Sequence, residues 1–162
     1  MNFTHCLDLS NQYVGTAKGE VRNKENKQNF NRVVMYFLDQ ADSVAWKYWP
    51  GDLQVAEESN VSTKGYNLLL PNRIKDMPIE EGMRISYFSI ESTTKEVLLK
   101  NSSPDIPTDV FDFQLLNNGN VLLHSFDNGS TLLFCASTEV YHDLVKLTSP
   151  NSILPILNKR PN

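Results

Sequence analysis

The chain has 162 residues and a formal net charge of −4 at pH 7. Its 40% hydrophobic and 21% charged content is ordinary for a globular protein, and its length suits one domain with a sizeable core. Because the balance is acidic and no basic stripe interrupts it, nucleic-acid binding is not the expected role.

The chain carries no recognisable membrane or secretory signal. No run approaches the roughly 18 apolar residues that a membrane span needs, and residues 1–10 lack a basic start followed by an apolar core. Cys6 and Cys135 are the only cysteines, which is too few for a disulfide framework. We therefore expect reduced thiols in a cytoplasmic protein.

The first half of the chain predicts mainly strands. Residues 1–10 could form a short amphipathic helix or a loop. Gly15 and Gly19 would mark a bulge or a bend inside the first strand. The stretch 22–29 is polar throughout and predicts an exposed turn. Alternation and apolar content predict strands at residues 12–21, 30–38, 44–49, 53–56 and 61–70.

The next stretch predicts a loop and then a hairpin. Residues 71–82 contain two prolines and a glycine, so we expect a loop that crosses one end of the sheet. Residues 83–90 and 96–100 predict two paired strands. Residues 101–108, which hold two more prolines, would then be a connector.

The clearest signal is a double hairpin with Asn-Gly pairs at residues 118–119 and 128–129. Asn-Gly favours the type I′ turn, which needs positive φ at both central residues. Two-residue loops would set the register so that Phe113 faces His124 and His124 faces Leu133. The face we expect inside is then Phe111, Phe113, Leu115, Leu122, His124, Phe126, Thr131, Leu133 and Cys135.

A helix is predicted at residues 138–147. Ser137 or Thr138 is a suitable N-cap, and Glu139 suits the positive end of the helix dipole. An apolar stripe follows at Val140, Leu144 and Leu147. The tail at 149–162 contains prolines that predict an extended segment, and its apolar residues suggest that it docks on the domain.

These elements amount to about eight to ten strands and one helix. Strands joined by short turns predict a mainly β fold, namely an antiparallel up-and-down β-barrel with one C-terminal α-helix. We expect a single domain over residues 1–148, comprising the barrel and the helix, and an extended tail at 149–162. A pleckstrin-homology-like barrel with a C-terminal helix is the alternative.

The order of the elements resembles the lipocalin-like (calycin) β-barrel proteins, where a glycine-containing first strand leads into a meander and a helix. Within that class the chain is similar to cyanobacterial phycobiliprotein chromophore lyases. The similar features are residues 3–10, Trp46 in a mid-chain strand and the Asn-Gly hairpin before residues 134–137. The run of residues 132–137 into 140–145 is instead similar to the last strand and helix of pleckstrin-homology-like domains.

No catalytic signature occurs in the sequence, whether nucleophile elbow, P-loop, dinucleotide-binding or zinc-protease motif. His5 with Cys6, and His142 with Asp143, lack the spacing of metal ligands. We therefore expect no catalytic residue, no metal and no cofactor. His124 is interpreted either as a polar group in an apolar ligand cavity or part of a Cys-His pair with Cys135, or as a core histidine bonded to a neighbour or water.

A barrel of about eight strands either holds one small ligand or fills with side chains. The sequence favours a non-enzymatic protein that binds a small apolar or aromatic ligand. One alternative is a protein-binding adaptor or inhibitor that uses an acidic surface and Trp49. A chromophore lyase or chaperone is a third reading, implied by the resemblance. The predicted ligand-binding residues are Trp46, Tyr48, Tyr87, Phe111, Phe113, His124 and Phe126.

Overall fold

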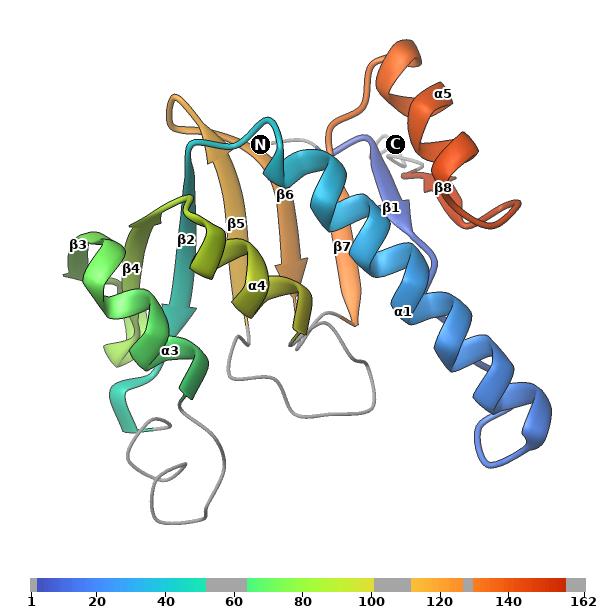
Figure 1. Cartoon of the computed structure of the whole chain (residues 1–162), viewed down its shortest axis with the longest axis horizontal. Coiled ribbons are helices and arrows are strands. Elements are labelled where there is room, and N and C mark those ends of the chain that lie inside the picture. The colour runs from blue at the N-terminus through green and yellow to red at the C-terminus, as the bar shows by residue number, and fades with distance from the viewer. Residues whose placement is uncertain (1–2, 52–63, 101–111, 127–129, 157–162) are drawn as a thin grey trace, which may run out of the picture.

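The computed structural model describes residues 3–51, 64–100, 112–126 and 130–156 (Figure 1). These residues form one eight-stranded antiparallel sheet in the order β3-β4-β2-β5-β6-β7-β1-β8, accompanied by four α-helices. The elements in chain order are β1 (His5–Leu7), α1 (Ala17–Leu38), β2 (Ser43–Tyr48), α3 (Lys64–Leu69), η1 (Leu70–Asn72), β3 (Arg73–Pro78), η2 (Glu80–Gly82), β4 (Arg84–Ser89), α4 (Ser92–Lys100), β5 (Asp112–Asn117), β6 (Asn120–Phe126), β7 (Thr131–Phe134), α5 (Thr138–Leu147) and β8 (Ile153–Pro155).

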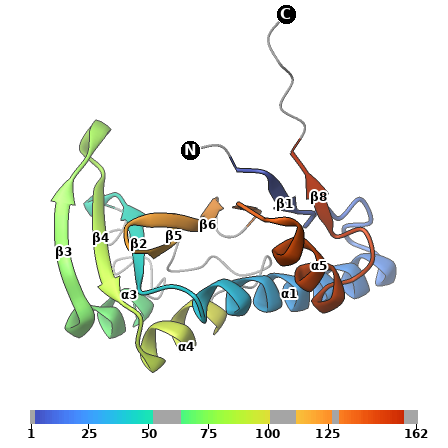
Figure 2. The ribbon, with the colours of Figure 1, turned by 90° about the horizontal axis from the view of Figure 1, so that it is seen from above.

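The sheet is open, with β3 and β8 as its edges in the described part of the chain. Figure 2 shows that both ends of the sheet curve away from α1, so the face opposite the helices is concave. The expectation of a closed up-and-down barrel is therefore wrong, and so is that of a single helix. The coarser expectation of a mainly antiparallel β-sheet is confirmed.

The largest difference from the sequence-based expectation is α1. It replaces the strands predicted at residues 12–21 and 30–38 and the turn between them. Thr16 caps its start by accepting a hydrogen bond from the amide of Gly19 at 3.1 Å. The buried positions of its C-terminal half are Phe30, Val33, Val34, Phe37 and Leu38, which follow helical spacing and not alternation. Residues 22–29 within it are all polar and lack an apolar stripe, and this pattern predicted a turn instead of a helix.

Two further predicted strands are helices. Residues 64–69 form α3 where a strand at 61–70 was expected, and residues 92–100 form α4 where one was expected at 96–100. The predicted loop at 71–82 instead contains β3, an exposed edge strand without an apolar face. Short apolar runs do not distinguish a strand from a helix turn, because only packing decides between them. The predicted strand at 53–56 and the connector at 101–108 lie outside the described residues.

The strands at β2 and β4, the three-stranded meander and α5 are confirmed. Ser137 is the N-cap of α5, and its hydroxyl accepts a hydrogen bond from the amide of Val140 at 3.3 Å. Part of the predicted tail docks through β8, which pairs with β1 and buries Ile153.

A β-bulge changes the register inside the first hairpin of the meander. Next to the turn, Leu116 faces Val121, as expected, but one step further on Leu115 faces Leu123. Leu122 is thus an extra residue in β6. Beyond it the predicted pairing is wrong by one residue, because His124 faces Gln114 and not Phe113. The second hairpin keeps the predicted register, with His124 opposite Leu133.

The bulge decides which side chains meet the helices. Side chains alternate between the two faces of a strand, so the helix side of the meander holds Phe113 and Leu115 of β5 and Leu123 and Ser125 of β6. The apolar ones form the main core with α1, α3 and α4, which lie along this face (Figures 1 and 2). The face predicted to be inside is therefore correct for Phe113 and Leu115 but wrong for His124, Phe126 and Leu133, which lie on the opposite face.

Two buried asparagines of α1 tie the chain ends to the domain. The Asn29 side chain is fully buried; it donates to Ser152 Oγ at 3.1 Å and accepts from the amide of Ser149 at 3.1 Å. Asn26 donates to the carbonyl of Leu9 at 2.7 Å. These two side-chain amides thus hold the segment before α1 and the segment after α5 in place. A hydrophobicity pattern would predict both asparagines to be exposed.

We expect Asn29→Ala to lower the free energy of unfolding by about 1–3 kcal/mol, because it removes the bond to the buried Ser152 hydroxyl and the bond from the half-buried Ser149 amide. The urea midpoint of unfolding measures this loss. Gln28→Ala, at an exposed position of the same helix, is the matched control and should be nearly neutral. Equal midpoints for the two variants would contradict the role of the Asn29 side chain.

Candidate functional site

The structure does not gather the seven predicted ligand-binding residues on one surface. Trp46, Tyr48 and Phe113 are buried on the helix side of the sheet, in the main core. The other three described residues lie on the concave face, and these are Tyr87, His124 and Phe126. Phe111 lies outside the described residues. A site must therefore be sought separately on each side of the sheet.

On the helix side, Tyr48 belongs to a hydrogen-bonded network around Asp76. The Tyr48 hydroxyl donates to Asp76 Oδ1 at 3.1 Å and accepts from the Tyr66 hydroxyl at 3.2 Å. Arg84 Nε and Ser86 Oγ also donate to Asp76, each at 2.7 Å. Burial disfavours ionisation of Asp76, but these bonds outweigh it and lower the pKa of the carboxyl. Burial and the bond from Tyr66 raise the pKa of Tyr48 to about 12. The groups satisfy one another, which indicates a structural role.

On the concave face, Asp112, His124, Gln114 and Lys47 form a second polar cluster. His124 Nε2 is 2.7 Å from Asp112 Oδ1, and His124 Nδ1 is 3.3 Å from Gln114 Nε2. Lys47 Nζ is 3.7 Å from Asp112 Oδ2. His124 is 5% exposed and Asp112 is 8% exposed, so both partners are largely removed from water. Cross-strand pairing holds the cluster in place, because Lys47 faces Asp112 and Gln114 faces His124.

Both nitrogens of the His124 imidazole have polar neighbours, and aromatic rings lie beside it. A neutral ring that donates from Nε2 to Asp112 and accepts at Nδ1 from Gln114 satisfies both nitrogens. The ring of Phe126 lies 3.5 Å from it between centroids, and that of Phe3 lies 6.1 Å away. A general base needs a nitrogen within reach of its substrate. This geometry therefore fits the second interpretation of His124, a histidine bonded to its neighbours.

A cleft of about 500 Å³ opens beside this cluster on the concave face. Lys47 and Asp112 belong to its sheet side, and the turn between β3 and β4 supplies the other wall. That turn is closed by a hydrogen bond from the Ile79 amide to the Met83 carbonyl at 2.9 Å. It contributes two apolar and two acidic residues to the lining: Ile79, Met83, Glu80 and Glu81.

The cleft adjoins a small apolar cluster of the concave face. Ala45, Ile85 and Leu116 are buried there, and the partly buried Ile79 and Tyr87 pack against them. The turn that forms the wall is thus anchored through Ile79, which lines the cleft as well. Ile79 therefore links the lining of the cleft to this apolar cluster.

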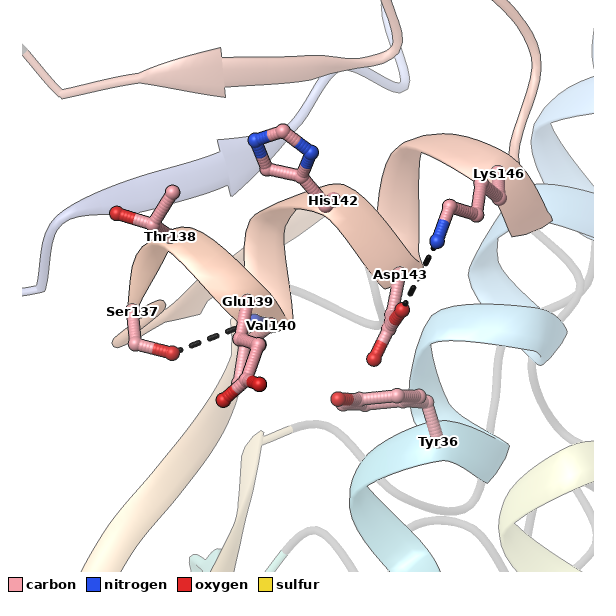
Figure 3. Close-up of a pocket in the computed structure, with 8 residues that line it drawn as sticks. All are labelled: Tyr36, Ser137, Thr138, Glu139, Val140, His142, Asp143 and Lys146. Atoms are coloured by element: carbon pink, nitrogen blue, oxygen red, sulfur yellow. Dashed lines mark hydrogen bonds and ion pairs between the residues drawn. The ribbon is translucent and has the colours of Figure 1, made fainter.

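A second hollow, of about 790 Å³, lies between α1 and α5. Figure 3 shows Glu139 and Asp143 on successive turns of α5, with their carboxylates directed toward the Tyr36 hydroxyl. Burial, followed by the charge of Asp143, raises the pKa of Tyr36. Lys146 Nζ is 3.5 Å from Asp143 Oδ1, and both side chains are exposed. The remaining lining residues are Ser137, Thr138, Val140 and His142. This hollow is open, polar and acidic.

Comparisons with family models, curated proteins and solved structures find no match to this chain. Within the described ranges, no three His, Cys, Asp or Glu side chains come together in a way that could hold a metal ion. In the same ranges, no helix is both long and apolar enough to cross a membrane. The site must be interpreted from its own geometry.

Sequence reasoning missed most of the cleft. Lys47 and Asp112 are single charged residues within apolar strands, and their pairing appears only when β2 and β5 are known to be neighbours. The sequence predicted a loop at Ile79 and the start of a strand at Met83, and so no wall of a cleft. The one usable signal was the alternation in β2, since it placed Lys47 on the face opposite Trp46.

The Tyr48 network predicts that part of the stability is lost at alkaline pH. An unfolded tyrosine titrates near 10, whereas folded Tyr48 titrates at about 12. The stabilisation is therefore complete below about pH 10 and is lost as the pH rises through about 12. Urea midpoints between pH 9 and 12 should fall more steeply in the wild type than in Tyr48→Phe. Tyr87→Phe is the matched control. Parallel curves for the wild type and Tyr48→Phe would show that ionisation of Tyr48 does not cause the alkaline loss of stability.

The Asp112–His124 pair predicts coupled effects on stability. His124→Leu or Asp112→Leu alone leaves a buried partner without its hydrogen bond, which costs about 1–3 kcal/mol. The double variant removes both partners, so its cost should fall short of the sum by about 0.5–3 kcal/mol in urea unfolding. His124→Leu combined with Asp143→Ala, on the distant α5, should be additive. Additivity in the first cycle would show that the two groups do not depend on each other.

Proposed function

We propose that this protein is a non-enzymatic binding protein that holds a small apolar or aromatic ligand group in the cleft on its concave face. The observation that carries the proposal is the cleft itself, where Ile79 and Met83 stand opposite Lys47 and Asp112. Ligand sites are concave, measure roughly 300–1,000 Å³ and combine apolar walls with a few polar groups. The cleft has this size, and Ile79 and Met83 give it an apolar part beside four charged residues.

The fixed geometry of the sheet side supports binding in preference to catalysis. Asp112 is held by His124 at 2.7 Å, and the imidazole is held in turn by Gln114. A carboxylate oriented by a buried neighbour is preorganised for recognition, because little freedom is lost when a ligand binds. The same contacts engage His124 fully, which leaves it poorly placed for proton transfer.

Recognition of a basic protein surface is the second candidate function. The hollow between α1 and α5 favours it, because Glu139 and Asp143 present two carboxylates beside Tyr36 at an exposed position (Figure 3). Acidic surfaces accelerate association with basic partners through long-range attraction. Only Val140 among the residues lining this hollow is aliphatic, so it suits a small apolar ligand less well than the cleft does.

The proposal predicts where an uncharged aromatic probe binds. In a titration with 2-phenylethanol followed by amide NMR, shifts should concentrate at Lys47, Ile79–Met83 and Asp112. Met83→Trp fills the cleft and should abolish these shifts. Met35→Trp, at a half-exposed position of α1, is the control and should leave them unchanged.

Two results would overturn this assignment of the site. One is the absence of saturable shifts in the wild-type protein at millimolar probe. The other is a set of shifts that persists in Met83→Trp or concentrates between α1 and α5. A circular dichroism melting curve for each variant confirms that the binding data come from folded protein.

A further inference from the structure

We propose that the ligand of the cleft carries a cationic amine next to its apolar or aromatic group. This inference rests on the proposed function and adds the charge of the ligand to it. Its basis is the combination of a buried carboxylate, an unequal set of charges and an apolar wall within one cleft.

The charges that line the cleft are unbalanced. Among the described residues that line the cleft, Glu80, Glu81 and Asp112 are acidic and Lys47 alone is basic, so their formal charge is −2. The whole chain carries −4, which has the same sign. A cation therefore approaches a cleft whose local and overall fields both attract it, whereas an anion would meet three carboxylates and one ammonium.

Asp112 provides a directed acceptor within this field. It is 8% exposed, and its Oδ1 atom is held by the imidazole of His124, whose Nε2 atom lies at 2.7 Å. Its Oδ2 atom faces the Lys47 ammonium at 3.7 Å, which is longer than a hydrogen bond. An amine of the ligand could approach Oδ2 to about 2.7–2.9 Å, the usual length of a charge-assisted bond.

The Lys47 ammonium can move away from Asp112 Oδ2 when a ligand amine binds there. Its side chain is 26% exposed, and four flexible carbons allow the ammonium to turn toward solvent. The apolar part of the ligand would then lie against Ile79 and Met83, which line the same cleft. The predicted class is thus a small amine with an aromatic or aliphatic group.

Three matched probes test the charge. They are 2-phenylethylamine, 2-phenylethanol and 3-phenylpropanoate, which share a phenyl group and carry positive, zero and negative charge at pH 7. Affinities measured by NMR titration at low salt should rank amine, alcohol and carboxylate in that order. We expect the amine to bind on the order of tenfold more tightly than the alcohol, as one charge-assisted bond would give.

Two variants locate the effect. Glu80→Gln with Glu81→Gln changes exposed residues of the turn, and Asp112→Asn keeps the shape of the buried side chain. Each should reduce the preference for the amine over the alcohol at least severalfold while alcohol binding persists. Glu139→Gln, on α5, removes the same charge elsewhere and should change nothing.

The outcomes separate this inference from the proposed function. If none of the probes binds, both fail. If the alcohol binds in the cleft as tightly as the amine, or the carboxylate binds most tightly, only the charge assignment fails. If the amine preference survives in both cleft variants, its origin lies outside the cleft and the inference is overturned. The turn variant keeps the test valid if Asp112→Asn does not fold.

Discussion

One extra residue in β6 is the constraint on which the rest of the structure depends. The bulge at Leu122 shifts the pairing of β6 with β5, so that Leu123 faces the helices beside Leu115. The same shift places His124 on the concave face, within 2.7 Å of Asp112. Without it, the imidazole would point into the apolar core, where an unpaired polar group costs several kcal/mol by the usual estimates. The bulge thus determines both the packing of Leu123 in the core and the position of His124 in the polar cluster.

The helix side and the concave side of the sheet differ in how their polar groups are covered and paired. On the helix side, the polar network around Asp76 is closed, because the carboxylate accepts hydrogen bonds from Tyr48, Arg84 and Ser86. The concave side keeps charge near its surface, and among the described residues no helix covers it, as Figure 2 shows. A buried carboxylate there needs partners, and His124 supplies the nearest one. The proposed site follows from this asymmetry, since a sheet covered on both faces would leave no cleft.

Much of the local structure was predictable where short-range geometry decides it. The Asn-Gly turn at Asn118-Gly119, with φ of 49° and 77°, shows the positive values that a type I′ turn requires. The Ser137 cap and the apolar spacing of α5 were equally clear. The first helix was not predictable in the same way. Its buried Asn26 and Asn29 interrupt the apolar stripe, and their bonds to segments far along the chain are invisible in a local window.

The turn at Asn118-Gly119, the central strands and the last helix were thus predictable from the sequence, because backbone preferences and alternation act over a few residues. The second Asn-Gly turn, at 128–129, lies outside the described residues. Tertiary structure alone decided the openness of the sheet, the face on which His124 lies and the meeting of Lys47 with Asp112. Strand order brings residues 47 and 112 together across β2 and β5, and a bulge of one residue reverses the facing of every side chain beyond it. The register of lowest free energy depends on packing between segments that are far apart in the sequence. A local sequence window therefore does not reveal it.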